Sequence, residues 1–214
     1  MYMELLKMLR ASGRLRTHMD LLEVSCGRGG GLAHLVRHWP GSIKATGLDL
    51  SRNALEACRR NYGQIENLTF VHGSALALPF PDQPFDAVLN VEASNDYGDY
   101  AAFFREVHRV LRPGGVFLYC DSRRARDARP TMQMMRDAGL VGEFRDITNH
   151  IVEACRLDSD RRVQLIRKRV PLPYWLLFGK ELCNYAAVEG SRKFEAFRSR
   201  RRIYMMTCAV KGGA

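Results

Sequence analysis

Short apolar runs alternate with helix-forming stretches along the first half of the chain. Five runs have the length and composition of buried strands, at residues 20–25, 43–50, 68–72, 85–91 and 116–121. Helix-forming patterns lie before and between them, at residues 1–12, 32–39, 52–61 and 100–111. Strands that alternate with helices at this interval predict βαβ units and a mainly parallel sheet.

Three local signals mark where these elements begin and end. Ser51 is a good N-cap for the helix at 52–61, because its hydroxyl can accept a hydrogen bond from an unpaired backbone N–H group. Pro40-Gly41 is expected to end the preceding helix, and residues 112–115 (Arg-Pro-Gly-Gly) the helix at 100–111. These signals place the turns of the predicted fold.

The second half of the chain has a different pattern. A helix is predicted at residues 130–138, and strands at 142–148 and 202–210. The segment between the two strands is too long for a loop, and residues 171–178 are too apolar to be free in solvent. We interpret residues 149–201 as a helical cap that binds substrate, inserted within a single domain of residues 1–214. Extra core packing on the flank of the sheet is the alternative.

Composition indicates a globular protein. Hydrophobic residues make up 46% of the 214 residues and charged residues 26%, which is ordinary for this class. The six cysteines show no C-x-x-C spacing, so neither a metal site nor a disulfide framework is expected, and a reducing cytoplasm is the expected compartment. No apolar stretch reaches the length of a membrane span, and the N-terminus lacks the apolar region of a secretory signal.

The net charge of +10 comes mostly from arginine. Local clusters occur at residues 123–129, 161–169 and 198–202. Such a balance is compatible with nucleic acid, a phosphorylated substrate or an acidic carrier protein as partner. Because basic residues are spread along the whole chain, we expect the clusters to be mainly solvated faces.

Polar and glycine residues gather where the predicted strands end. They are residues 23–29, Asp49, residues 73–75, residues 90–95 and Asp121. The carboxyl ends of parallel strands meet at one edge of a sheet, and ligands bind there in open α/β folds. The sequence therefore predicts one ligand site at this edge.

The first of these strand ends carries the pattern Glu23-x-Ser25-x-Gly27-x-Gly29. A dinucleotide fingerprint would need a third glycine where Leu32 stands, and the Gly-Lys-Ser/Thr of a P-loop is absent. The pattern resembles motif I (E/D-x-G-x-G-x-G) of the class I S-adenosylmethionine-dependent methyltransferases, with Ser25 in place of the first glycine. An ordinary strand-to-helix turn is the alternative for this stretch alone.

Further segments carry the same resemblance. Residues 77–86 look like the family's L-P-F-P-D-x-x-F-D stretch, and residues 111–115 look like its L-R-P-G-G turn. Residues 90–97 (Asn-Val-Glu-Ala-Ser-Asn-Asp-Tyr) are similar to a segment of bacterial small-molecule methyltransferases, a branch with phthiotriolone, fatty-acid and polyketide-antibiotic O-methyltransferases. The C-terminal landmarks are residues 146–148, residues 188–191 and Tyr204.

This resemblance implies a Rossmann-like fold with a mostly parallel seven-stranded sheet, and S-adenosyl-L-methionine as cofactor. An acid at Asp49 can accept hydrogen bonds from both ribose hydroxyls, Leu50 would pack on the adenine, and Ser74 replaces the usual acid of a Gly-Asp-Ala turn. The residues expected to bind the cofactor are Glu23, Ser25, Cys26, Gly27, Gly29, Asp49, Leu50, Gly73, Ser74, Ala75, Asn90, Val91 and Glu92.

The implied reaction is methylation of a hydrophobic natural product or lipid-like molecule, most often at a hydroxyl. His150 is the candidate general base, oriented by Asp121 or Asp96, and Asn95 stands where the family has a histidine. Tyr97, Tyr174, Trp175 and Phe178 are the candidate substrate contacts.

Several alternatives stay open at this point. Carbon or nitrogen acceptors, presentation of the acceptor by a carrier protein, and completion of the site by a second subunit are compatible with the pattern. A nucleic-acid methyltransferase is disfavoured, because the fourth strand ends in Asn90-Val91-Glu92-Ala93 rather than in an Asn/Asp-Pro-Pro-aromatic element. A non-catalytic binding protein on the same scaffold is the remaining alternative, motivated by Ser25 and Ser74.

Overall fold

The computed structural model describes residues 1–39 and 42–212. The expected helix stop at Pro40-Gly41 lies outside the described residues. The chain divides into two compact units. The first comprises Met1–Asp121, Arg129–Arg145 and Met206–Ala214, and the second comprises Ser122–Ala128 and Asp146–Met205.

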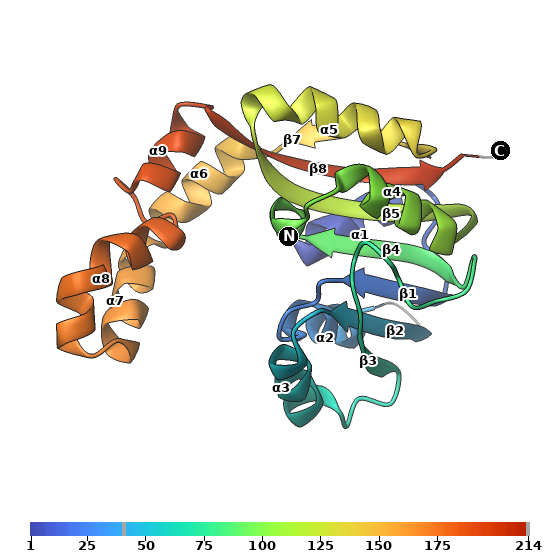
Figure 1. The fold of residues 1–214 in the computed structure, drawn as a ribbon, viewed down its shortest axis with the longest axis horizontal. Coiled ribbons are helices and arrows are strands. Elements are labelled where there is room, and N and C mark those ends of the chain that lie inside the picture. Colours follow the sequence, from blue (N-terminus) through green and yellow to red (C-terminus); the bar gives the residue numbers. More distant parts are fainter. Residues whose placement is uncertain (40–41, 213–214) are drawn as a thin grey trace. The chain divides into compact units, whose positions relative to one another are not determined.

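A mostly parallel sheet is the centre of the first unit (Figure 1). Its strands are β1 (His18–Val24), β2 (Ser42–Asp49), β3 (Leu68–His72), β4 (Phe85–Val91), β5 (Leu111–Arg124), β6 (Leu140–Val141), β7 (Phe144–Asp146) and β8 (Arg202–Lys211). The order is β3-β2-β1-β4-β5-β8-β6, and β7 also pairs with β8. β1 to β5 pair in parallel, whereas β6 runs antiparallel to β8. This is the Rossmann-like methyltransferase arrangement that the sequence predicts.

The described residues form eight strands rather than the expected seven. The strand predicted at 142–148 is present as β7 but is shorter, since it covers only Phe144–Asp146 and Thr148 already begins a helix. The Asp146 side chain accepts hydrogen bonds from both the N–H and the hydroxyl of Thr148 (2.9 and 2.5 Å), which turns the chain away from the sheet. The alternating apolar and polar pattern could not show that these side-chain hydrogen bonds replace strand pairing at Thr148.

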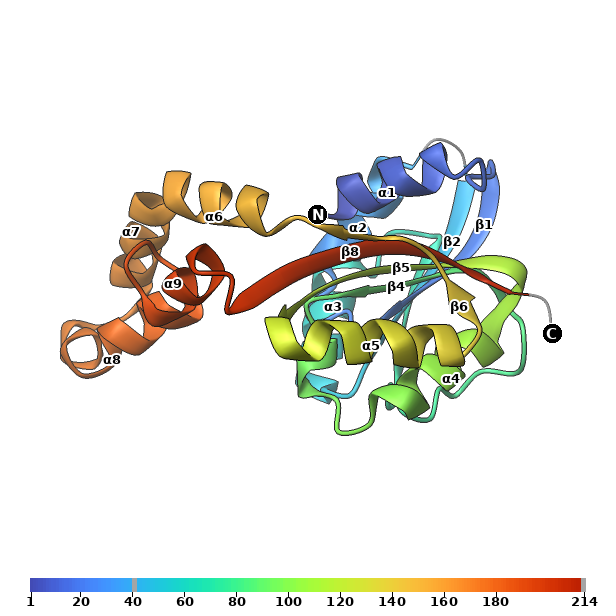
Figure 2. The ribbon, with the colours of Figure 1, turned by 90° about the horizontal axis from the view of Figure 1, so that it is seen from above.

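Helices cover both faces of this sheet (Figure 2, with α1 on one side and α4 on the other). The helices are α1 (Tyr2–Ala11), α2 (Gly30–Arg37), α3 (Arg52–Tyr62), α4 (Tyr100–Val110) and α5 (Ala125–Asp137), with a short 3₁₀ turn η1 (Ser94–Asp96) after β4. Ser51 caps α3 as predicted, its hydroxyl accepting from the Ala54 N–H at 3.2 Å. α5 begins earlier than predicted and carries Pro130 inside it.

The core that positions the strand ends lies between α4 and the middle of the sheet. α4 buries Phe103, Phe104, Val107 and Val110, which share one face of the helix. They pack in one cluster with residues of β4 and β5, among them Val88, Phe117 and Tyr119. Each buried aromatic ring contributes roughly 2–3 kcal/mol to the stability of the folded state. The cluster therefore fixes the positions of β4 and β5 relative to α4.

β5 starts irregularly, at the sequence expected to stop the preceding helix. Its pairing with β4 jumps from Phe85–Leu111 to Ala87–Val116, so the four residues 112–115 of β5 lie opposite the single residue Asp86 of β4. Gly114 occupies the left-handed region (φ +71°), which glycine adopts without strain. The Arg-Pro-Gly-Gly segment therefore forms a bulge within the sheet.

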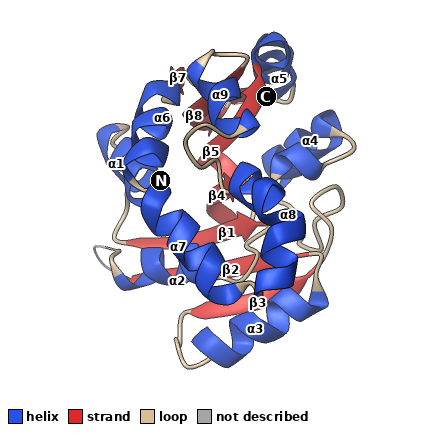
Figure 3. Cartoon of the chain, turned by 90° about the vertical axis from the view of Figure 1, so that its left-hand side faces the viewer, coloured by secondary structure: helices blue, strands red, loops and turns tan. Residues whose placement is uncertain are grey.

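The second unit is mainly helical (Figure 3). Its helices are α6 (Thr148–Leu157), α7 (Ser159–Arg169), α8 (Leu172–Tyr185) and α9 (Arg192–Arg198). Cys155 of α6, Ala187 and Phe194 of α9 form a small buried cluster. Residues 149–201 are thus helical, as the sequence predicts. No helix within the described residues has the length and apolar character needed to cross a membrane.

Candidate cofactor site

The glycine loop after β1 meets the end of β2. The Asp49 carboxylate accepts from the Gly27 N–H through Oδ2 and from the Ser51 N–H through Oδ1, both at 2.8 Å. The Cys26 N–H donates to the Leu48 carbonyl at 2.9 Å. The two strand ends that the sequence places at one edge are therefore joined directly. Each Asp49 oxygen keeps a second lone pair that can accept a hydroxyl proton.

Two glycines of the loop have different surroundings. Gly27 has φ +55°, and nothing lies within 4 Å of the position a Cβ would take. Gly29 has φ +73°, but a Cβ there would lie 3.0 Å from the Cys58 sulfur and from the Phe70 ring. Gly27 therefore leaves open space beside the loop, whereas Gly29 permits close packing of the loop on α3 and β3.

Ser25 takes the conformation that the missing glycine would take. Its φ is +59°, in the left-handed region, which costs a non-glycine residue about 1 kcal/mol. Its hydroxyl lies 2.6 Å from the hydroxyl of Tyr97, and Tyr97 also accepts from the Asn90 amide at 2.9 Å. Burial, opposed by both hydrogen bonds, raises the pKa of Tyr97 to about 12. These bonds offset the strain at Ser25 and fix the loop.

Glu23 is buried beneath the loop with one oxygen unpaired. Its Oε1 accepts from the Tyr2 hydroxyl at 2.5 Å, while Oε2 has no hydrogen-bond partner among the described residues. Burial raises the pKa of Glu23 to about 8, opposed by the Tyr2 bond and assisted by the Asp49 charge. Desolvation likewise raises the pKa of Tyr2, which therefore stays a donor.

Tyr2 is a residue of this site that sequence reasoning missed. The pattern indicated only an amphipathic helix at residues 1–12, and no motif points to a tyrosine there. Its ring lies over Gly31, where an added Cβ would come within 2.0 Å of the ring. The consecutive glycines 29–31 were the available signal, since the last of them is needed for this helix contact.

Asp121 organises the segment that follows β4. Its carboxylate accepts from the Ser94 N–H (2.9 Å), the Ser94 hydroxyl (2.6 Å) and the Asn95 amide (2.6 Å). Glu92 has φ +53°, and its N–H donates to the Cys120 carbonyl at 2.8 Å. The end of β5 therefore holds residues 92–95 in a fixed and locally strained conformation.

The remaining predicted cofactor residues divide into two groups. Leu50 is 68% exposed, Val91 is half-buried, and the Ser74 hydroxyl accepts from the Leu76 N–H at 3.1 Å while keeping its own proton to donate. The Gly73 N–H donates to the Asp49 carbonyl at 3.1 Å. The side chains of Cys26 and Ala75 instead pack into hydrophobic clusters, which leaves only their backbone groups for a ligand.

The predicted catalytic and substrate residues lie in different units. Asn95, Asp96 and Tyr97 belong to the first unit. His150 is an exposed residue in the first turn of α6, in the second unit. It follows β7 along the chain, but that strand ends at Asp146 and does not contain Ile147 as expected. Tyr174 and Phe178 are exposed on α8, and Trp175 is half-buried beneath the Arg167 guanidinium, 5.0 Å from the ring centroid. Their catalytic and substrate roles stay predictions. The described residues contain no group of three or more potential metal ligands.

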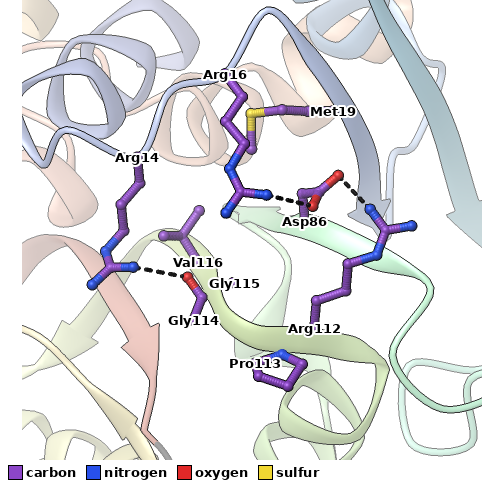
Figure 4. Close-up of a pocket in the computed structure, with 9 residues that line it drawn as sticks. All are labelled: Arg14, Arg16, Met19, Asp86, Arg112, Pro113, Gly114, Gly115 and Val116. Atoms are coloured by element: carbon purple, nitrogen blue, oxygen red, sulfur yellow. Dashed lines mark hydrogen bonds and ion pairs between the residues drawn. The ribbon is translucent and has the colours of Figure 1, made fainter.

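Charged residues of two family landmarks, residues 77–86 and 111–115, lie at the amino ends of the strands. Arg112 forms ion pairs with Asp86 (2.6 Å) and Asp20 (2.8 Å), and Arg16 lies 3.6 Å from Asp86. Figure 4 shows Asp86 between these two arginines, beside Arg14, which donates to the Gly114 carbonyl at 3.1 Å. They line a cavity of about 250 Å³ at the amino end of β4 and β5. Asp86 and Arg112 of these motifs therefore stabilise the amino edge of the sheet, whereas Ala77 and Pro79 of the first motif lie against Ser74 and Gly73.

Sequence comparison shows that this chain is similar to known methyltransferases. A family described as "Methyltransferase domain" matches residues 22–119. A fatty-acid O-methyltransferase of Mycolicibacterium smegmatis is 38% identical over 89% of this chain and 67% of its own length. A phthiotriol/phenolphthiotriol dimycocerosates methyltransferase of Mycobacterium ulcerans is 48% identical over 80% of this chain and 66% of its own length. The chain spans about two thirds of the length of these relatives.

Solved structures show the same fold. A Galdieria sulphuraria protein described as a sarcosine dimethylglycine methyltransferase superposes with a TM-score of 0.81 at 18% identity, covering 99% of this chain and 85% of its own. The [4+2]-cyclase SpnF superposes with a TM-score of 0.76 at 19% identity, covering 100% and 81%. The fold and the strand-end site define a class I, Rossmann-like methyltransferase. With relatives of this identity and coverage, the chain belongs to the S-adenosylmethionine-dependent methyltransferases.

The residues present fit S-adenosylmethionine, the cofactor of this family. Its ribose diol needs acceptors such as the free lone pairs of Asp49, and its α-ammonium needs an acceptor such as the unpaired Oε2 of Glu23. The buried Oδ1 of Asn90 is a further acceptor without a partner among the described residues. The open space beside Gly27 leaves room for the ligand against the backbone.

Proposed function

We propose that this chain transfers the methyl group of S-adenosylmethionine to an oxygen of a hydrophobic, lipid-like small molecule. The observation that carries the proposal is the direct junction of Asp49 with Gly27, next to two buried oxygens that lack partners. Relatives named for fatty-acid and phthiotriol substrates support the choice of acceptor class.

In this proposal the residues of the first unit bind and orient the cofactor. Asp49 accepts from the ribose hydroxyls, Glu23 accepts from the α-ammonium group, and Leu50 and Ser74 contact the adenine. The cofactor supplies an electrophilic methyl group on a sulfonium. Ser25 and Tyr97 hold the loop so that this group keeps one position relative to β4.

Methyl transfer from a sulfonium is an in-line displacement. The acceptor oxygen forms a bond to the methyl carbon while the carbon–sulfur bond breaks, and the electron pair of that bond stays on sulfur. The protein's contribution is to hold the two reactants aligned and to exclude water. A hydroxyl acceptor must also lose its proton, and we assign that step to His150.

The apolar surface of α8 supports a hydrophobic acceptor. Leu172, Tyr174, Leu176, Leu177 and Phe178 are each more than half exposed. An apolar patch of this kind marks a binding surface for an apolar partner. We assign Tyr174, Trp175, Phe178 and Tyr97 to contacts with the acceptor chain.

Incubation with labelled S-adenosylmethionine and a panel of long-chain fatty acids, phenols and hydroxylated lipids tests the reaction. We expect label in an ether or ester product of at least one hydrophobic acceptor. Asp49→Asn should reduce transfer and S-adenosylhomocysteine affinity by about tenfold, because an amide replaces one acceptor oxygen by a donor. Cofactor binding without transfer to any acceptor would favour the non-catalytic alternative.

His150 is tested by comparing two kinds of acceptor. If it is the base, His150→Gln should reduce kcat about 100-fold for a hydroxyl acceptor. A carboxylate acceptor should lose much less, since it carries no proton at neutral pH. Equal losses with both acceptors would show that His150 acts in another way.

A further inference from the structure

Two arginine clusters that lie far apart in the sequence meet in the second unit. The first cluster includes Arg124, the last residue of β5, and Arg126. The second includes Arg201 and Arg202, where β8 begins. The Ala125 N–H donates to the Arg201 carbonyl at 2.9 Å, which joins the two segments. The sequence led us to expect separate solvated faces at these clusters.

These arginines surround one cavity. It has a volume of about 630 Å³ and is lined mainly by Arg124, Arg126, Arg192, Glu195, Arg201 and Arg202. Five guanidinium groups and one carboxylate thus share a concave surface. All of the lining residues belong to the second unit, and the proposed cofactor site lies in the first.

The positive charge of this cavity is only partly compensated. Arg192 pairs with Glu181 at 2.9 Å, and Arg126 lies 3.6 Å from Asp127. Glu195 pairs with Arg198, which does not line the cavity. Within residues 1–39 and 42–212, no carboxylate lies within ion-pair distance of Arg124 or Arg201.

Two of the guanidinium groups are held in place by hydroxyls. Arg202 donates to the Ser122 Oγ at 2.9 Å, and Arg201 donates through Nε to the Ser199 Oγ at 3.1 Å. The Ser199 hydroxyl is neutral, so it orients the Arg201 guanidinium without cancelling its charge. Groups that are oriented before binding lose less entropy when a ligand arrives.

The arginine-lined cavity of Figure 4 provides a contrast within the same chain. There Asp86 and Asp20 compensate Arg16 and Arg112, at 2.6 to 3.6 Å. That arrangement joins strands and leaves little net charge. The cavity of the second unit has no corresponding buried acid among its lining residues.

From the convergence of these arginines around one concave, positively charged cavity, we infer that the second unit contains a binding site for a phosphate ester. The planar guanidinium fork matches the oxygens of a phosphate group in a bidentate manner. A volume of this size holds a headgroup and its first linking atoms. The same chemistry is presented by a soluble phosphate monoester and by the headgroup of an anionic lipid. This inference does not depend on the proposed methyl transfer.

Binding is measured on the full chain without S-adenosylmethionine, at near-physiological salt. The probes are glycerol 3-phosphate in calorimetry, and phosphatidylcholine vesicles with and without phosphatidic acid in co-sedimentation. The test variant is Arg124→Gln with Arg201→Gln, two exposed side chains whose loss leaves no buried group unpaired. The matched control is Arg60→Gln with Arg105→Gln, which makes the same charge change at exposed positions of α3 and α4.

We expect saturable binding by the wild-type protein and at least about a tenfold loss in the test variant, with less than a twofold change in the control. A third variant, Arg124→Lys with Arg201→Lys, keeps the charge but removes the fork, and should lose an intermediate amount. Circular dichroism and the melting temperature of each variant show that it is folded.

The two probes separate the sources of the phosphate. Binding of glycerol 3-phosphate identifies a soluble ester as sufficient, whereas binding only to vesicles that contain phosphatidic acid identifies a lipid headgroup. The inference is overturned if neither probe binds, or if the control variant loses as much as the test variant. Binding restricted to an acidic protein such as polyglutamate would also overturn it.

Discussion

In the ligand-free protein, burial beneath the glycine loop holds Glu23 in the protonated form. Its pKa of about 8 lies above the ordinary 4.5. Between these values the unfolded chain releases a proton that the folded chain retains, so the free energy of unfolding falls as pH rises from about 4.5 to about 8. Below this window both states are protonated, and the stabilising contribution is complete.

Glu23→Gln should therefore stabilise the ligand-free protein at pH 8 relative to wild type, and should flatten its stability between pH 5 and 8. The same change should weaken S-adenosylhomocysteine binding about tenfold, because a neutral amide cannot supply the negative charge that a deprotonated Glu23 offers to the α-ammonium group. Denaturant unfolding across pH and calorimetry measure the two effects. Tyr2→Phe is the control: it removes a bond that lowers the Glu23 pKa, so the fall in stability should extend to higher pH.

The glycines of the loop allow a second comparison at single positions. Gly27→Ala places a methyl group in open space at positive φ, which should cost about 1 kcal/mol of stability but at least about tenfold in cofactor affinity. Gly29→Ala adds contacts at 3.0 Å to the same backbone strain, and should cost about 2–3 kcal/mol. Thermal unfolding and calorimetry should rank the two variants in opposite orders. Equal effects on binding would mean that the space beside Gly27 is not where the cofactor lies.

At the scale of elements, Arg109 ties α4 to the loop before β4. Its guanidinium donates to the carboxylates of Glu106 and Asp82 and to the carbonyls of Leu78 and Phe80, at 2.8 to 3.0 Å. Arg109→Met should lower the free energy of unfolding by about 2 kcal/mol, and should leave cofactor affinity within about twofold. Arg105→Gln, exposed on the same helix, should change neither quantity. A large loss of affinity with little loss of stability would contradict the structural role of this loop.

The sequence predicted those elements whose signals are local. β3 and β4 have the predicted bounds, and Ser51 caps α3, because apolar runs and a capping hydroxyl act within a few residues. The junction of Asp49 with Gly27 followed from the rule that parallel strand ends meet at one edge. The pattern could not show that Thr148 begins a helix, since the hydrogen bonds that Thr148 donates to the Asp146 side chain depend on the folded geometry.

Contacts between segments that are distant in the sequence could not be predicted, because no local signal in the sequence specifies them. Tyr2 reaches Glu23 only after α1 packs on α2, and nothing near Tyr2 in the sequence encodes that packing. Residues 77–86 and 111–115 carry the family resemblance, yet Asp86 pairs with Arg112 at the amino edge of the sheet, and Asp82 accepts from Arg109 of α4. A family motif therefore indicates which fold the chain adopts, but the folded structure is needed to identify which residues of the motif contact a ligand.

At the scale of the whole molecule, the two units carry different chemistry. The first holds buried acids and a glycine loop that suit a charged nucleoside, and the second holds the exposed apolar residues of α8. In the proposed assignments the cofactor binds to the first unit, whereas most of the acceptor contacts belong to α8 of the second unit. Hydrogen exchange separates these events, since a bound ligand slows opening of the backbone that it contacts.

S-adenosylhomocysteine alone should slow amide exchange at residues 25–29, 49–51 and 92–97. A long-chain fatty acid alone should slow exchange across α8 and leave the glycine loop unchanged. Trp175→Ala should abolish the second effect and retain the first, because it removes an aromatic ring of α8 without touching the cofactor residues. Protection by the fatty acid confined to the first unit would show that Tyr174, Trp175 and Phe178 do not bind the acceptor. The apolar face of α8 would then bind another partner. The cofactor assignments are tested separately, by the exchange measured with S-adenosylhomocysteine alone.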